Sequence, residues 1–181
     1  MWKKGGYFLG RYVIPFFTFV LLWISIFSTD VLADEELSRE EVLQQRMAYY
    51  IHFGEFLVPW YYLAAIDQYE RNIQSVRSDI PKRDSVIAIQ FSEEYWDGPL
   101  NSTDGDSPPS DISYFGGMGL DGNGDGIADR NNDEDIIYTM ASYLSQFGLE
   151  EDYFKLALYE YYRTEEAVNQ IIAIAKIYKH F

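Results

Sequence analysis

The stretch from Val58 to Ile73 constrains the fold most, because it combines a helix start with a long apolar stripe. Pro59 suits the first turn of a helix, where its missing N–H would have had no partner. The residues behind it recur at i, i+3, i+4, i+7 and i+11, which is the period of one helix face: Tyr62, Ala65, Ile66, Tyr69 and Ile73. The pattern predicts a central helix that buries one face.

Glu70 lies at the edge of this stripe, between Ile66 and Ile73 on the helix surface. A carboxyl group in that position can lose water, and desolvation raises its pKa towards that of a usable general acid. The alternative is an ordinary solvated Glu on a helix face. From this window alone, the solvated Glu is the better interpretation.

Composition limits the classes of function. A chain of 181 residues with 48% hydrophobic residues holds one domain and a short appendage. The absence of Cys excludes disulfides, and His52 and His180 are too few for a His-rich zinc site. A net charge of −15 argues against nucleic acid as a partner, because phosphate contacts need clustered Lys and Arg. The 16 Tyr residues suit a carbohydrate or peptide groove, although Tyr is also ordinary core filling.

Residues 1–33 have the features of an export signal. Lys3, Lys4 and Arg11 precede an uncharged apolar run over 12–27, and Ala33 ends a stretch typical of signal-peptidase sites. The alternative is an uncleaved anchor that contacts the membrane, because 12–29 reaches the lower limit for crossing a bilayer. In both cases the charges place the following domain, 34–181, outside the cytoplasm.

The rest of the chain predicts a mainly α fold. Ser38 and Glu41 form a capping-box pattern at the start of a helix that contains His52 and ends near Gly54. Later helices are expected over 134–146, 151–162 and 165–178. The β-branched run 86–91 predicts one strand or an extended buried segment, and 101–113 predicts a polar loop that is functional or disordered.

An acidic, glycine-rich loop follows at 121–129 and predicts a structural Ca²⁺ site. Its oxygen ligands recur at alternate positions, with Gly126 at the sharp turn; the candidate ligands are Asp121, Asn123, Asp125, the Ile127 carbonyl and Asp129. An EF-hand would end with Glu at the twelfth position, where this chain has Asn132. The closing ligand therefore stays open, with Asp133 as the candidate. The alternative is an acidic turn without metal.

Four short segments resemble the lysozyme-like lytic transglycosylases, and they occur in that family's order. The segments are Pro59 to Glu70, Phe115 to Gly119, the loop from Asp121 with its following helix, and Ala157 to Tyr161 with Val168. The resemblance implies a lysozyme-like helical domain with Glu70 as the sole general acid and base. It also implies a groove for the glycan strands of peptidoglycan, with Tyr69, Trp96, Tyr114, Met118 and Tyr161 as candidate lining residues.

Two segments, Val58 to Arg71 and Phe115 to Gly126, resemble one group of sequences in particular. This group is the N-terminal domain of secreted M23-type cell-wall endopeptidases of spore-forming Gram-positive bacteria. Those enzymes cut the L-Ala–D-Glu bond of peptidoglycan stem peptides with a zinc site in a separate C-terminal domain. This chain has no His-x-His motif. The resemblance therefore implies a wall-facing domain, either native or truncated, without the peptidase zinc site.

Three departures from the transglycosylase pattern bear on activity. Arg71 follows Glu70 where the family has a small hydroxyl residue, and pairing of Arg71 with Glu70 would lower the pKa of the acid. Gly119 replaces a substrate-binding Gln, and Tyr162 replaces the Asn after the closing Tyr161.

These observations leave three interpretations. The domain cleaves glycan during cell-wall remodelling, including sporulation, or it binds the wall without cutting and positions a peptidase. In the third interpretation, the predicted Ca²⁺ loop is a regulatory sensor and the groove binds a peptide.

Overall fold

The computed structural model describes residues 38–77, 85–100 and 106–181, which belong to one compact unit. The predicted export segment lies outside the described residues. The helices of the unit are α2 (Arg39–Gly54), α3 (Trp60–Val76), α4 (Glu93–Asp97), α5 (Pro109–Tyr114), α6 (Asp133–Ser145), α7 (Glu151–Tyr162) and α8 (Glu165–Tyr178). This confirms the prediction of a mainly α fold.

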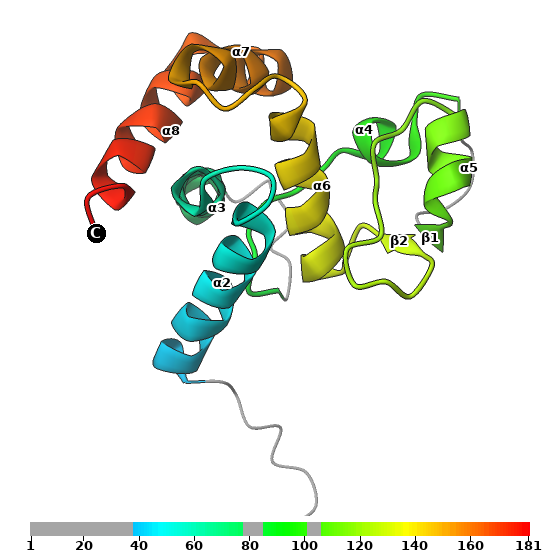
Figure 1. Cartoon of the computed structure of the whole chain (residues 1–181), viewed down its shortest axis with the longest axis horizontal. Helices are drawn as coiled ribbons and strands as arrows, with labels where there is room; N and C mark the ends of the chain where they lie inside the picture. Colours follow the sequence, from blue (N-terminus) through cyan, green and yellow to red (C-terminus); the bar gives the residue numbers. More distant parts are fainter. Residues whose placement is uncertain (1–37, 78–84, 101–105) are drawn as a thin grey trace, which may run out of the picture. The chain divides into compact units, whose positions relative to one another are not determined.

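Helix α3 is the centre of the unit. It lies between α2, α6 and α8, and all three contact it (Figure 1). Its first half is buried on every side, from Tyr62 to Asp67. Tyr62 stacks on Phe154 of α7 with ring centroids 3.7 Å apart, and Leu63, Ala65 and Ile66 have no exposed surface. The predicted stripe is therefore part of a helix that packs against several neighbours at once.

The turn between α2 and α3 explains why the two helices approach closely. The capping box at Ser38 is present, and α2 ends at Gly54 as predicted. A Cβ on Gly54 would lie 2.8 Å from the Trp60 Cα, so only glycine fits where the helices meet. Pro59 is the residue just before the first helical position of α3, with an extended ψ of 127°.

The segment 86–91, called the extended segment below, is buried except at the half-buried Val86 and Gln90, and none of its residues is in a strand. Side chains of α3 make the hydrogen bonds to its backbone that a neighbouring strand would make. Arg71 donates to the Val86 carbonyl and Gln74 to the Ala88 carbonyl, at 2.8 and 2.7 Å. The strand alternative of the prediction is therefore wrong, because these polar groups satisfy the backbone without a sheet.

The region predicted as a polar loop contains regular structure instead. Strand β1 (Asp106–Ser107) pairs antiparallel with β2 (Ala128–Asp129), and α5 follows it directly. Ile112 of α5 is fully buried, and this single apolar contact is too sparse to produce a helical period in the sequence. None of the helices that the structure describes combines the length and the apolar character needed to cross a bilayer.

Candidate functional site

Glu70 lies in the second half of α3, where its side chain is half-buried. The Tyr162 hydroxyl donates a hydrogen bond to Glu70 Oε1 at 2.7 Å. Burial, the largest cause, and the negative charge of Asp67 together raise the pKa of Glu70 to about 7, against the lowering effect of the Tyr162 bond. A carboxylic acid with this pKa exchanges its proton near neutral pH, which suits general acid–base chemistry.

A group of tyrosine rings extends from Tyr162, the residue that bonds this carboxyl group. Tyr69 meets the edge of Tyr162 at 5.3 Å between centroids, and Tyr162 meets Tyr161 at 4.9 Å. Tyr95 and Tyr143 flank Tyr161 in turn, at 5.5 and 5.7 Å. Burial raises the pKa of both Tyr161 and Tyr162, so their hydroxyls stay protonated and act as donors.

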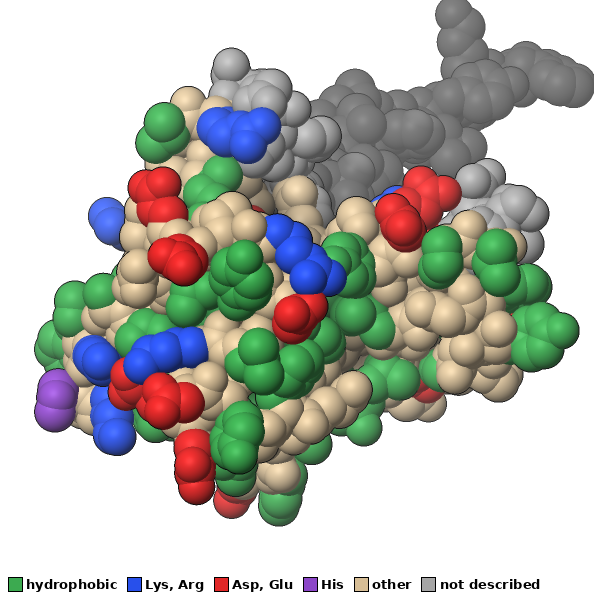
Figure 2. All heavy atoms as spheres, turned by 90° about the horizontal axis from the view of Figure 1, so that it is seen from above, with side chains coloured by type: hydrophobic (Ala, Val, Ile, Leu, Met, Phe, Trp, Pro, Cys, Tyr) green, Lys and Arg blue, Asp and Glu red, His purple; other side chains and the backbone are tan. Residues whose placement is uncertain are grey.

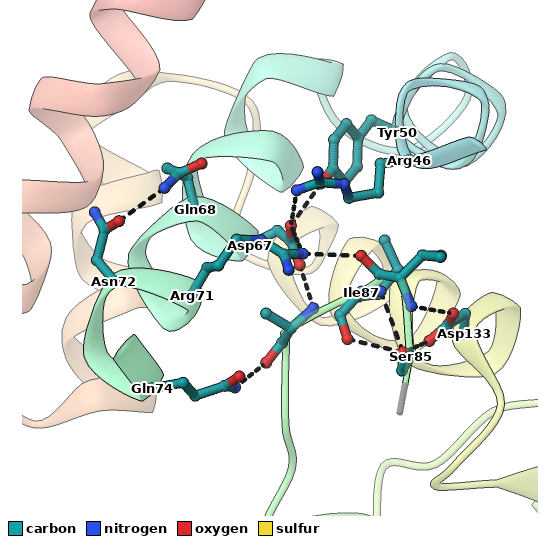
Figure 3. Close-up of polar contacts among 12 residues, drawn as sticks. Arg46, Tyr50, Asp67, Gln68, Arg71, Asn72, Gln74, Ser85, Ile87 and Asp133 are labelled. Atoms are coloured by element: carbon teal, nitrogen blue, oxygen red, sulfur yellow. Dashed lines mark hydrogen bonds and ion pairs between the residues drawn. The ribbon is translucent and has the colours of Figure 1, made fainter. Parts of the chain in front are cut away.

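Arg71 does not pair with Glu70. Its guanidinium donates to Asp67 Oδ2 at 2.8 Å and to the Val86 carbonyl at the same distance. Figure 3 shows the Arg71 side chain directed at Asp67 and the extended segment. The first departure from the transglycosylase pattern therefore places no positive charge on the candidate acid.

Asp67 is the centre of a polar cluster that sequence reasoning missed (Figure 3). The side chain is 1% exposed and accepts from the Tyr50 hydroxyl at 2.7 Å, with Arg46 Nη1 at 3.9 Å. The Ala88 N–H donates to its other oxygen. One carboxylate thereby connects α2, α3 and the extended segment. The only available signal was the i, i+4 spacing of Asp67 and Arg71.

The predicted groove residues have three different placements. Tyr69 and Tyr161 lie in the aromatic group around Glu70, and the Met118 N–H donates to the Tyr95 carbonyl at 3.0 Å beside that group. Tyr114, at the end of α5, is 83% exposed. Trp96 has no exposed surface and its Nε1–H donates to the Ala128 carbonyl at 3.4 Å, so this indole is part of the core.

The position of Trp96 explains the glycine at 119. A Cβ on Gly119 would lie 2.7 Å from the Trp96 ring. The Gln of the transglycosylase pattern cannot fit beside this indole without displacing it. The change at 119 is therefore coupled to the packing of Trp96.

The acidic loop is organised by hydrogen bonds from its own backbone. Asp121 accepts from the N–H groups of Gly124, Asp125 and Gly126, at 2.6, 3.2 and 2.7 Å. Gly124 and Gly126 have φ values of 79° and 93°, which strain other residues.

The carboxylate that reaches the loop from α6 is Asp135. It accepts from the N–H groups of Gly122, Asn123 and Asp129, whereas the predicted closing ligand Asp133 bonds Ser85 and the Val86 N–H. Within residues 38–77, 85–100 and 106–181, no three His, Asp or Glu side chains gather closely enough to hold a metal ion. The Ca²⁺ site with Asp121, Asn123, Asp125, Ile127 and Asp129 stays a prediction.

Comparison with known proteins gives one informative similarity. No protein-family model and no solved structure matches the chain. The chain is 39% identical over 162 residues to an L-Ala–D-Glu endopeptidase of Bacillus subtilis (strain 168), and the match covers 88% of the chain. It spans about half the length of that curated relative, 49%. At this identity the two sequences are related over the matched region.

Proposed function

We propose that this chain is a peptidoglycan-binding module of the kind that places an L-Ala–D-Glu endopeptidase on its substrate. The observation that carries the proposal is the 39% identity to such an endopeptidase over most of this chain but only half of the relative. A bond between L-Ala and D-Glu belongs to the stem peptides of peptidoglycan, so a protein that cuts it works at the cell wall. The module would act there, outside the cytoplasm.

The aromatic group around Glu70 supports this role. Tyr rings bind sugars with their faces while their hydroxyls donate hydrogen bonds. Tyr69 is half-buried, and its ring is held against Tyr162. A pre-positioned ring loses little conformational freedom when a ligand binds, which favours affinity.

Cosedimentation with purified peptidoglycan tests the binding proposal. We expect residues 34–181 to pellet with the polymer and Tyr69→Ala to pellet at least several-fold less. Tyr159→Ala is the matched control, because Tyr159 is a 43% exposed tyrosine on α7. If the wild-type protein stays in the supernatant at every concentration, the binding proposal is wrong.

A second candidate function is cleavage of the glycan strand by Glu70, and the pKa of about 7 favours it. The protonated carboxyl would donate its proton to the glycosidic oxygen between N-acetylmuramic acid and N-acetylglucosamine, and the bond from this oxygen to the anomeric carbon of N-acetylmuramic acid would break. The resulting carboxylate would then take the proton of the muramic 6-hydroxyl, which attacks the anomeric carbon and closes the anhydro ring. This sequence needs one carboxyl group in both protonation states.

Mass spectrometry of digested peptidoglycan tests the second candidate. We expect anhydro-muropeptides from the wild type and none from Glu70→Gln, with Glu40→Gln, an exposed position of α2, as the control. Equal product profiles for wild type and Glu70→Gln, with both proteins still bound to the polymer, would leave binding as the function.

A further inference from the structure

The adjacent residues Tyr161 and Tyr162 at the end of α7 point their hydroxyls at different partners. The Tyr161 hydroxyl donates to the Gln90 carbonyl at 3.0 Å, and the Tyr162 hydroxyl donates to Glu70 Oε1 at 2.7 Å. Position 162 is also where this chain has Tyr in place of the Asn of the transglycosylase pattern. The side chain that contacts the candidate acid is thus one that the family pattern does not supply.

We propose that Tyr162 is the positioning residue of Glu70: its hydroxyl occupies Oε1 and leaves Oε2 as the oxygen that gains and loses the proton. This inference rests on the acid–base role proposed above for Glu70. The Tyr162 hydroxyl can donate to the carboxyl group in both protonation states. A proton on Oε1 would compete with this bond, so the exchangeable proton belongs on Oε2.

The backbone next to Tyr162 is held in place by the end of α7. Tyr162 is the last residue of α7, and Arg163 ends the helix in the left-handed conformation with a φ of 57°. This conformation is uncommon for a residue other than glycine. The Arg163 N–H returns to the Tyr159 carbonyl at 2.8 Å, and the guanidinium bonds Glu160 at 2.6 Å. The end of α7 is therefore closed directly beyond the tyrosine.

The hydrogen bond from Tyr162 also affects the pKa of Glu70. A hydrogen bond donated to a carboxyl group favours its charged form and lowers its pKa, whereas burial favours the neutral form. Both effects act on Glu70, and burial is the larger. Removing the Tyr162 hydroxyl leaves burial unopposed, so the pKa of Glu70 should rise further.

The test compares Tyr162→Phe with Tyr161→Phe, which removes the neighbouring hydroxyl but leaves Glu70 untouched. The ¹³C NMR signal of the Glu70 carboxyl, identified by its loss in Glu70→Gln, is followed against pH in residues 34–181. We expect Tyr162→Phe to raise the pKa of Glu70 by about one pH unit and Tyr161→Phe to change it by much less. An unchanged pKa in Tyr162→Phe, or equal shifts in both variants, would overturn the proposal.

Activity gives a second and separable readout. If the wild type releases anhydro-muropeptides, we expect the alkaline limit of kcat to move to higher pH in Tyr162→Phe and to stay in place in Tyr159→Phe, which removes an exposed hydroxyl from the same helix. A purely structural role for Tyr162 would lower the amount of folded protein without moving this limit. If the wild type releases no such products, glycan cleavage is wrong, and the NMR titration still decides whether Tyr162 positions Glu70.

Discussion

Two carboxyl groups one turn apart on α3 have opposite surroundings. Asp67 is buried among two arginines, a tyrosine hydroxyl and a backbone N–H. Glu70 is half-buried and receives its 2.7 Å bond from the neutral Tyr162 hydroxyl. A carboxylate held by cations is a fixed structural anchor, because its charge is compensated in place. A carboxyl group held by a neutral donor in an apolar site stays able to exchange its proton.

The largest effect should come from breaking the anchor. Asp67→Asn leaves Arg46 and Arg71 without their anion and should lower the free energy of unfolding by about 3 kcal/mol. Urea denaturation followed by circular dichroism measures the change. Glu70→Gln is the matched control at pH 6, where it should cost less than about 1 kcal/mol. Equal losses in the two variants would mean that both carboxyl groups are structural.

The second effect is the pH dependence of stability that Glu70 produces. Its folded pKa of about 7 exceeds the usual value of 4.5, so the folded state binds the proton more tightly than the unfolded state. The stabilisation is present in full below pH 4.5 and is lost as the pH rises through about 7. Wild type should lose about 2 kcal/mol more than Glu70→Gln across this range, which is less than the full shift implies because solvent screens the half-buried carboxyl group. Parallel urea denaturation series at successive pH values measure the difference.

One outcome would contradict the predicted pH dependence of stability. This outcome is a constant difference in the free energy of unfolding between wild type and Glu70→Gln from pH 4.5 to pH 8. The carboxyl group would then have the same pKa in the folded and unfolded chains. Glu70 would then be an ordinary surface glutamate, which is the interpretation that the helix window alone favours.

The sequence predicted the helices that carry Asp67 and Glu70 but not the partners of the two carboxyl groups. Capping residues and apolar periods are local, so they located both ends of α2, α6, α7 and α8 and the start of α3 within about one residue, whereas α3 continues three residues past the predicted stretch. The partners of the two carboxyl groups are remote: Tyr50 is 17 positions from Asp67, and Tyr162 is 92 positions from Glu70. Local pattern contains no information on which carboxyl group meets a cation, because packing between helices decides it.

The short elements were missed for a related reason. Helix α4 begins where the Ser92 side chain accepts from the Tyr95 N–H, and its Trp96 reaches the core. Five residues are too few to show a helical period. Trp96 then appeared as a groove residue because a tryptophan in sequence does not reveal whether its ring faces solvent.

A third acidic site extends the comparison beyond α3. The face of the molecule in Figure 2 mixes acidic and basic side chains. Lys155 and Lys176 both form ion pairs with Glu151. The loop from Asp121 to Asp129 has a high density of carboxylates, and N–H groups of its own backbone donate to two of them, Asp121 and Asp125.

Thermal melts with Ca²⁺ and with a chelator test whether this loop binds an ion or is a turn without metal. If Ca²⁺ binds only the folded state, 1 mM Ca²⁺ should raise Tm by several degrees relative to chelator, through roughly 1–2 kcal/mol of added stability. Asp121→Asn should abolish the rise. Asp133→Asn should preserve it if Asp135 closes the site, since Asp133 bonds Ser85 instead. No rise in the wild type would favour the turn without metal.

The smallest expected effect is also the sharpest test of the two carboxyl groups. Arg71 adjoins Glu70 in sequence but bonds Asp67 at 2.8 Å in the structure. Arg71→Gln should therefore shift the ¹³C-detected pKa of Glu70 by less than about 0.3 pH units, because the guanidinium charge is already compensated by Asp67. The same variant should lower the free energy of unfolding by about 1 kcal/mol, since Arg46 still faces the anchor. A rise of a full pH unit in the pKa of Glu70 would instead show that Arg71 stabilises the Glu70 carboxylate, and the division between anchor and acid would fail.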